Sequence, residues 1–272
     1  MPTSEFRLNL AVVIGINDYQ NGIPALGTAR QDAEAIAKIL ERDYHYQVHL
    51  MTESQATSEN LMRWLETELP EMLATANPSR FLFYFAGHGI ALNGDDGPEG
   101  YLILHNSRLG EVSTYLPMSQ VYNALIQLSC RHFLGILDCC FAGAFRWAST
   151  RKLVPIELGT IHKERFDRFI QDPAWQVITS AAYDQTALDN FDLKDDRGQT
   201  DGHSPFAAIL IDALQGKADA YPPAEPGQPA GDGVITATEL YLYLRDRLEA
   251  ETDAHSIRQT PGICPLKKHD KG

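Results

Sequence analysis

The sequence predicts an α/β fold in which a mostly parallel central sheet of about six strands is covered by helices on both faces. One observation is that short runs of β-branched and aromatic residues alternate along the chain with longer segments of helical periodicity. The other is that these short runs are almost continuously apolar, as expected for strands buried on both faces of a parallel sheet. In such folds the functional site lies at the carboxyl ends of the strands.

The first strand and helix are clearly marked. Residues 8–16 (LNLAVVIGI) form a β-branched apolar run that stops at the polar residues Asn17 and Asp18, which predicts a buried strand followed by a loop. Residues 28–42 have helical periodicity and predict a helix. The apolar residues on its expected inner face are Ala33, Ile36, Ala37 and Leu40.

Two further strands enclose a second helix. Residues 47–51 predict a short strand, and the apolar run at residues 80–86 predicts a longer one that ends next to His88. Residues 57–76 between them predict a helix. Its apolar positions, at helical spacing, are Leu61, Trp64, Leu65, Leu69 and Leu73.

The next segment is less regular. Residues 92–100 are rich in Gly, Asp and Pro and predict a loop, and residues 101–104 predict a small strand. Pro117 is expected to open a helix that runs through Leu128, because proline is favoured at the first helical position.

The second half of the chain continues the alternation. Strands are predicted at residues 132–137 and 175–179, and helices near residues 162–170 and 205–214. Residues 217–233 are rich in Pro, Gly and Ala and predict a loop. Thr236 and Glu239 have the spacing of a capping box, which predicts a helix that starts after Thr236.

Composition excludes several classes of protein. The 272 residues are enough for one large domain or two small ones, and a formal net charge of −13 argues against a nucleic-acid-binding surface. No apolar run reaches about 18 residues, so no membrane span is expected, and the N-terminal segment MPTSEFRLNL lacks the features of a secretory signal. The spacing of the four cysteines does not resemble a zinc site, which favours a reducing, cytoplasmic location.

Reactive and polar side chains follow the ends of the predicted strands. His88 follows FYFAG, and Asp138, Cys139 and Cys140 follow the strand at residues 132–137. Since the carboxyl ends of parallel strands meet at one edge of a sheet, these side chains are expected in one site, together with Asn17 and Ser180. A cysteine beside a histidine is the pairing of a thiol nucleophile with its proton carrier, although a buried cysteine and a structural histidine are the alternative.

Five motifs together resemble the caspase-like cysteine peptidases, nearer to metacaspases and orthocaspases than to animal caspases. They are AVVIGINDY, LGTARQDA, FYFAGHG, LDCCFAG and ITSAAYDQTALD, within residues 8–216. The resemblance implies the caspase–haemoglobinase fold. It also implies a Cys–His dyad in which Cys140 is the nucleophile and His88 the proton carrier, and an oxyanion hole formed by the backbone N–H groups of Gly89 and Cys140. Gly89 could instead be a simple turn glycine.

The resemblance further implies a preference for substrates with Arg or Lys before the scissile bond. Asp138 and Asp32 match the acids that bind this basic side chain in metacaspases, and Asp184 is a third candidate. Asp32 could instead favour the start of its helix, where acids are stabilising. Ala86 departs from the pattern, because many relatives have a serine hydroxyl at that position.

By the same resemblance, residues 1–272 form a single peptidase domain. Its parts are a large-subunit-like part of about residues 1–145, a linker of about 146–172 and a small-subunit-like part of about 173–272. The basic residues within 146–168 could be an autoprocessing site, with a solvated linker as the alternative. The ending is expected to stop without a final packed element, as in a domain excised from a longer protein with a fused or associated sensor module.

No cofactor is required by the expected chemistry, but metacaspases are often activated by calcium. Asp95, Asp96 and Glu99 could bind Ca²⁺ after the histidine loop. The segment GDGVITATEL resembles half an EF-hand loop but lacks the earlier ligands, so a turn and a helix cap are expected there.

Three hypotheses for function remain open. The leading one is a cysteine endopeptidase acting on proteins or peptides after Arg or Lys. The others are a catalytically silent caspase-like module that serves as an interaction scaffold, and a peptidase that cleaves after Asp.

Overall fold

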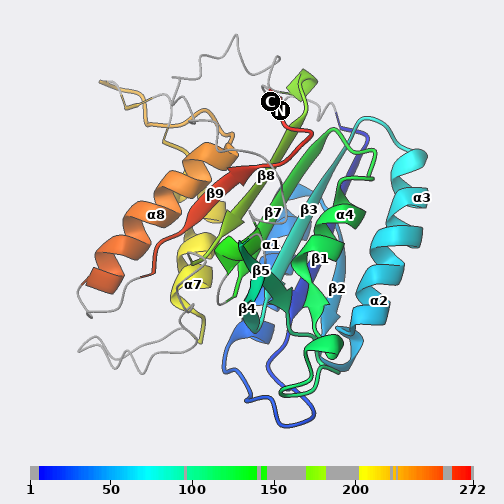
Figure 1. Ribbon diagram of the computed structural model, residues 1–272. Coiled ribbons are helices and arrows are strands. Elements are labelled where there is room, and N and C mark those ends of the chain that lie inside the picture. The colour runs from blue at the N-terminus through cyan, green and yellow to red at the C-terminus, as the bar shows by residue number, and fades with distance from the viewer. Residues whose placement is uncertain are drawn as a thin grey trace.

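A six-stranded sheet forms the centre of the molecule in a computed structural model (Figure 1). The structure describes residues 6–94, 97–139, 142–145, 170–181, 202–220, 223–224, 226–253 and 259–270. Neighbouring strands are parallel except for the last pair, which is antiparallel. In spatial order the strands are β2 (Gln47–Thr52), β1 (Leu8–Gly15), β3 (Ser79–Ala86), β7 (His132–Asp138), β8 (Ala174–Thr179) and β9 (Gly262–Pro265).

The carboxyl ends of the four central strands lie at one edge of this sheet. Gly15 of β1 is in register with Ala86 of β3, and Ala86 is in register with Asp138 of β7. Thr179 of β8 lies opposite Leu137, one residue earlier on β7. Residues that follow these strands are therefore brought to the same edge although they are far apart in the sequence.

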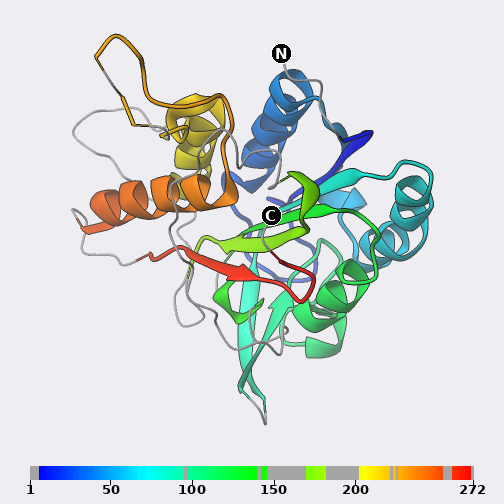
Figure 2. The ribbon, with the colours of Figure 1, turned by 90° about the horizontal axis from the view of Figure 1, so that it is seen from above.

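Helices cover both faces of the sheet, as predicted (Figure 2). One face packs on α1 (Ala29–Tyr44), α7 (Pro205–Asp212) and α8 (Ala237–Asp253). The other packs on α2 (Ser58–Arg63), α3 (Leu69–Ala74) and α4 (Met118–Leu125). Each face has its own apolar core, because successive residues of a strand point to opposite sides of the sheet.

Helix α1 approaches β1 closely at Gly15. A Cβ atom at Gly15 would lie 2.5 Å from the Ala33 Cβ atom, a distance that real side chains do not adopt. The absence of a side chain at Gly15 thus allows the start of α1, which carries Asp32, to sit directly on the end of β1.

The predicted helix at residues 57–76 is interrupted by a π turn. Residues Trp64–Glu68 form this turn between α2 and α3, and Pro70 lies in the first turn of α3. Proline has no backbone N–H, so the regular hydrogen bond to the preceding turn cannot form there.

The loop predicted at residues 92–100 is instead part of a hairpin. Strands β4 (Gly89–Gly94) and β5 (Gly97–Leu102) pair antiparallel, and β5 also pairs with β6 (Leu116–Pro117). A Cβ atom at Gly100 would lie 2.5 Å from the Met118 sulfur, so the glycine lets β5 pack closely against α4. The glycines that suggested a loop are tolerated here because pairing and packing outweigh the low strand propensity.

The expectation that the chain ends without a packed element is wrong. Strand β9 pairs with β8, and the Leu266 N–H donates to the Trp175 carbonyl at 2.7 Å. Pro261 precedes this short edge strand and Pro265 is its last residue, a position where the missing N–H of proline is tolerated. The helix predicted near residues 162–170 lies outside the described residues except for its last residue.

The capping box before α8 is confirmed. The Thr236 N–H donates to Glu239 Oε2 at 2.9 Å, and the Glu239 N–H donates to Thr236 Oγ1 at 3.2 Å. The turn expected just before it is also present: the Val234 N–H donates to Asp232 Oδ1 at 3.0 Å, and the Asp219 carboxylate accepts from the N–H groups of Asp232 and Gly233.

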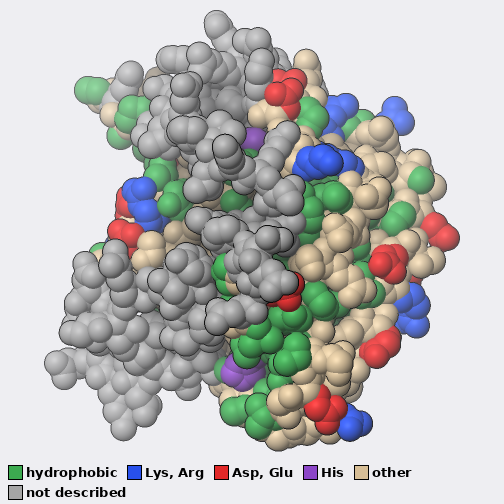
Figure 3. All heavy atoms as spheres, viewed as in Figure 1, with side chains coloured by type: hydrophobic (Ala, Val, Ile, Leu, Met, Phe, Trp, Pro, Cys, Tyr) green, Lys and Arg blue, Asp and Glu red, His purple; other side chains and the backbone are tan. Residues whose placement is uncertain are grey.

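On the face seen in Figure 3, basic side chains of the described residues are interspersed with acidic ones. This described part of the face therefore has no continuous basic surface of the kind that binds nucleic acid. None of the helices in the described ranges is long and apolar enough to cross a membrane.

Candidate active site

His88 follows the end of β3 and is oriented by a backbone carbonyl. Its Nε2 atom lies 2.9 Å from the carbonyl oxygen of Pro24. A carbonyl oxygen can only accept a hydrogen bond, so in this contact Nε2 carries the proton. In a neutral imidazole the other ring nitrogen, Nδ1, is then left as the proton acceptor. The contact thus selects the tautomer that a general base requires.

Tyr19 holds His88 from the other side. The His88 N–H donates to the Tyr19 hydroxyl at 2.8 Å, and the two ring centroids are 4.9 Å apart. Tyr19 and Pro24 both belong to the loop between β1 and α1. That loop therefore fixes the backbone and the ring of His88 together.

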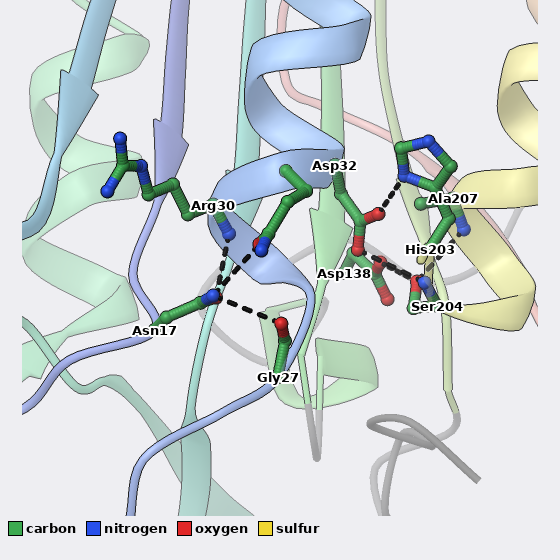
Figure 4. Close-up of polar contacts among 9 residues, drawn as sticks. Asn17, Gly27, Arg30, Asp32, Asp138, His203, Ser204 and Ala207 are labelled. Carbon is green, nitrogen blue, oxygen red and sulfur yellow. Dashed lines mark hydrogen bonds and ion pairs between the residues drawn. The ribbon is translucent and has the colours of Figure 1, made fainter. Parts of the chain in front are cut away.

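Asn17 closes this loop against the start of α1 (Figure 4). Its Oδ1 atom accepts from the Arg30 N–H at 2.8 Å, and its Nδ2 group donates to the Gly27 carbonyl at 3.1 Å and to Gln31 Oε1 at 2.9 Å. Thr28, the residue before the helix, makes no side-chain cap. Asn17 thus caps α1 from a distance of several residues and anchors the loop that holds His88.

Gly89 begins β4 directly after His88. The Ile103 N–H donates to the His88 carbonyl at 3.0 Å, and Gly89 lies opposite Leu102. In antiparallel strands, bonded and non-bonded pairs alternate, so Gly89 and Leu102 form a non-bonded pair. The Gly89 N–H therefore points away from β5, on the side where β4 is the edge of its sheet.

The strand that leads to the predicted nucleophile lies beside the strand that leads to His88. The Gly87 N–H donates to the Asp138 carbonyl at 3.3 Å, and Cys139 is buried with 1% of its surface exposed. Cys140 and Asp184 lie outside the described residues. The structure therefore places the chain two residues before Cys140 next to the chain just before His88.

Asp32 lies in the first turn of α1 and is almost completely buried, with 1% of its surface exposed. Its carboxylate contacts a segment just before α7: Oδ1 lies 2.5 Å from His203 Nδ1, and Oδ2 accepts from the Ser204 N–H at 3.3 Å. Burial raises the pKa of Asp32, and the hydrogen bonds from His203 and Ser204 partly oppose that increase. The Asp32 carboxylate thus joins the segment before α7 to the start of α1, where it also has a hydrogen bond with the Thr28 side chain.

Asp138 contacts the same segment. The Ser204 hydroxyl donates to Asp138 Oδ2 at 2.9 Å and accepts from the Ala207 N–H at 3.1 Å as the cap of α7 (Figure 4). Ser204 therefore touches both acids that were predicted for one pocket. Neither His203 nor Ser204 was predicted as a site residue from the sequence, although Ser204 before Pro205 has the pattern of a helix start.

Two buried hydroxyl groups lie near these acids. Tyr84 and Ser180 are completely buried, and neither hydroxyl has a hydrogen-bond partner within the part of the chain that the structure describes. Burial raises the pKa of Tyr84 well above its usual value, and the charges of Asp138 and Asp32 raise it further. Tyr84 is thus within electrostatic range of both carboxylates.

The residues suggested for calcium are only partly described. Asp95 and Asp96 lie outside the described residues, and Glu99 accepts a hydrogen bond from the Tyr101 hydroxyl at 2.8 Å. Across the described ranges, no group of three or more His, Cys, Asp or Glu side chains is arranged to hold a metal ion.

Comparisons with known proteins give one family and one fold. A family model described as the caspase domain matches residues 8–267. The structure is similar to caspase-1 from Spodoptera frugiperda, with a TM-score of 0.60 and 11% identity over 97% of this chain and 89% of that one. It is also similar to protein GSU0716 from Geobacter sulfurreducens, with a TM-score of 0.55 and 14% identity over 95% and 93% of the two chains. No curated protein matches the sequence.

Proposed function

The chain belongs to the caspase domain family of cysteine peptidases, and on that premise we propose that it is an endopeptidase of the metacaspase or orthocaspase type. Its substrates are proteins or peptides with Arg or Lys before the scissile bond. The single observation that carries the specificity is the meeting of two buried carboxylates, Asp32 and Asp138, on one residue, Ser204.

In the proposed reaction, Nδ1 of His88 accepts the proton of the Cys140 thiol. The thiolate attacks the carbonyl carbon of the scissile bond, and the resulting oxyanion accepts hydrogen bonds from the N–H groups of Gly89 and Cys140. The imidazolium then returns its proton to the leaving amine as the C–N bond breaks. Water, activated by the same imidazole, hydrolyses the thioester and restores the thiol.

The contact with Pro24 supports this role for His88. Hydrogen bonding through Nε2 leaves Nδ1 as the base before the reaction, and the same carbonyl stabilises the imidazolium after the proton transfer. An isolated thiol has a pKa of about 8.5, so a base is needed to supply thiolate at neutral pH.

The charges around Ser204 support a basic substrate. Two carboxylates in one buried cluster repel each other and are costly to desolvate unless a cation joins them. A guanidinium group offers five N–H donors in a planar fork, which suits two carboxylates and nearby hydroxyl groups such as those of Tyr84 and Ser180. Asp184 is proposed as a third contact of the same basic side chain.

The proposal also covers activation of the enzyme, its processing, its location and its associated module. The dyad requires no metal ion, and calcium activation through Asp95, Asp96 and Glu99 is a separate option that a chelator tests. Autoprocessing within residues 146–168, a cytoplasmic location and an associated sensor module are further parts of the proposal. Residues 1–145 and 173–272 would then be the large-subunit-like and small-subunit-like parts of one domain.

The test compares fluorogenic peptides that carry Arg, Lys or Asp before the cleaved bond, with calcium and with a chelator. Turnover of the Arg and Lys peptides is expected. It should be abolished in Cys140→Ala and retained in Cys139→Ala, the matched control for loss of a neighbouring thiol. Turnover of the Asp peptide alone would favour an Asp-cleaving enzyme, and no turnover under any condition would favour a silent scaffold.

A further inference from the structure

His203 and Ser204 contact both acids of the proposed specificity pocket from one segment. Ser204 donates its N–H to Asp32 Oδ2 and its hydroxyl to Asp138, and the Nδ1 atom of the neighbouring His203 contacts the other Asp32 oxygen, Oδ1. Figure 4 shows the two acids, from α1 and β7, pointing toward this segment. The distance between the two carboxylates is thus set by a third element of the chain.

The contacts with this segment favour the charged form of Asp32. Burial alone disfavours its charge, and Asp138 on β7 and Tyr84 on β3 provide no positive charge. Of the described groups, His203 is the imidazole that contacts it, with 21% of its side chain exposed against 1% for Asp32. His203 therefore sits at the outer side of the buried acid.

The contacts leave capacity for a substrate. A carboxylate has about four lone-pair positions, so Asp32 can accept from a substrate while it still accepts from His203, Ser204 and Thr28. Asp138 can likewise accept from a substrate while it still accepts from the Ser204 hydroxyl. The segment can thus position both acids without being displaced when a basic side chain enters.

We propose that His203 and Ser204 are positioning residues of the specificity pocket, which hold Asp32 as a carboxylate and align it with Asp138 for one basic side chain. This inference rests on the proposed function. The pair acts on substrate binding rather than on the chemical step, since neither contacts His88 in the described structure. Loss of His203 should therefore raise KM for basic peptides and leave kcat nearly unchanged.

The sign of the pH effect follows from the hydrogen bond. Because the His203 contact favours the charged form of Asp32, its removal raises the pKa of Asp32 further. In His203→Ala, the acidic limb of the plot of kcat/KM against pH should then move to higher pH. In the pH range of that limb, KM for an Arg peptide should be raised about tenfold. His203→Asn, whose amide nitrogen can take the place of Nδ1, should restore both values.

Ser204 needs a control because it also caps α7. Ser204→Ala should raise KM for the Arg peptide about tenfold, whereas Thr57→Ala, which removes the cap of α2 by losing its contact with the Asn60 N–H, should lower stability without changing KM. Equal effects of the two variants on KM would assign Ser204 a structural role and overturn its part of the proposal.

The decisive experiment measures kcat and KM against pH for these variants, and benzamidine binding by calorimetry in the Cys140→Ala background. Weaker benzamidine binding in His203→Ala, restored in His203→Asn, is expected together with the shifted limb. If the His203→Ala enzyme is active, with its acidic limb unmoved and its benzamidine binding unchanged, the positioning role is overturned while the proposed function stands. Benzamidine binding without peptide turnover would remove the catalytic proposal but keep the pocket, and neither binding nor turnover would overturn both.

Discussion

The Nε2 atom of His88 is hydrogen-bonded to the carbonyl oxygen of Pro24 at 2.9 Å, across 64 positions of the chain. The loop that provides this carbonyl also provides the Tyr19 hydroxyl, and Asn17 ties the loop to the start of α1. The same helix carries Asp32. One contiguous segment therefore orients the proposed base and carries one of the two acids of the proposed specificity pocket.

Removal of the Tyr19 hydroxyl should weaken catalysis. In Tyr19→Phe the His88 N–H loses its acceptor while the ring contact is kept, so kcat should fall about tenfold with KM unchanged. Steady-state kinetics with an Arg peptide measures this. Tyr44→Phe is the control, because the Tyr44 hydroxyl bonds the Leu214 carbonyl away from the site. Equal losses of kcat in the two variants would contradict the positioning role.

Neutralising Asp138 should remove the preference for basic side chains. Asp138→Asn keeps the shape of the side chain and its contact with Ser204 but removes the charge, so kcat/KM for Arg peptides should fall about a hundredfold. The same change at the exposed Asp246, which pairs with Arg245, should have no effect. Retained activity on Arg peptides would show that Asp138 does not bind the substrate cation.

The pH dependence of stability should reveal the buried Asp32. Its pKa is raised above 3.8 in the folded state, so the folded state binds protons more tightly and the free energy of unfolding decreases as pH rises through this window. Asp32→Asn lacks this decrease, so its free energy of unfolding minus that of the wild type should increase with pH and level off above the window.

A variant with the opposite sign provides the control for Asp32. The pKa of the exposed Asp43 is lowered by its hydrogen bond with Arg42, so the difference for Asp43→Asn should decrease, weakly, as pH rises. Urea titrations between pH 3 and 8 measure both differences. A slope of the same sign in the two variants would contradict a raised pKa of Asp32 in the folded state.

Alkylation of the native protein should modify one cysteine. Cys130, Cys139 and Cys264 are buried, and burial raises the pKa of Cys130 to about 12, so these thiols react slowly at neutral pH. Iodoacetamide should therefore add one group, at Cys140, and abolish activity. Mass spectrometry of native and unfolded protein counts the adducts, and rapid labelling of Cys130 in the native state would contradict its burial.

A methyl group at Gly15 should destabilise the fold. The added Cβ atom would collide with Ala33 of α1, so Gly15→Ala should lower the free energy of unfolding by about 1–3 kcal/mol. Gly110→Ala is the control for a change of glycine to alanine where a Cβ atom meets no other atom within 4 Å, although its positive φ adds its own strain. Denaturant titration measures both.

Most of the central sheet was predictable because its strands are apolar on both faces and are separated by strongly periodic helices. The hairpin of β4 and β5 was missed because its glycines have low strand propensity, and cross-strand pairing overrides that local preference. Strand β9 was missed because it is short, follows one proline and ends in another. Such elements are defined by partners that are distant in the sequence.

In the candidate site too, some residues could be predicted from local sequence motifs and others could not. His88, Asp32 and Asp138 were predictable as site candidates from motifs at strand or helix ends, and their roles remain proposals. Pro24 and His203 were not, since one acts through its backbone and the other stands alone in the sequence. Their importance depends on which distant atoms they meet, which periodicity and motifs do not encode.

Strand β8 lies between β7 and β9, with parallel pairing on one side and antiparallel pairing on the other. If the proposed autoprocessing severs the chain between β7 and β8, the two fragments remain joined by the backbone hydrogen bonds between these two parallel strands. The specificity pocket would itself straddle the break, with Asp32 and Asp138 on one fragment and His203 and Ser204 on the other. Chain scission would then produce two polypeptides that stay together in one non-covalent complex. Dissociation of the two fragments would separate the residues of the pocket and inactivate the enzyme.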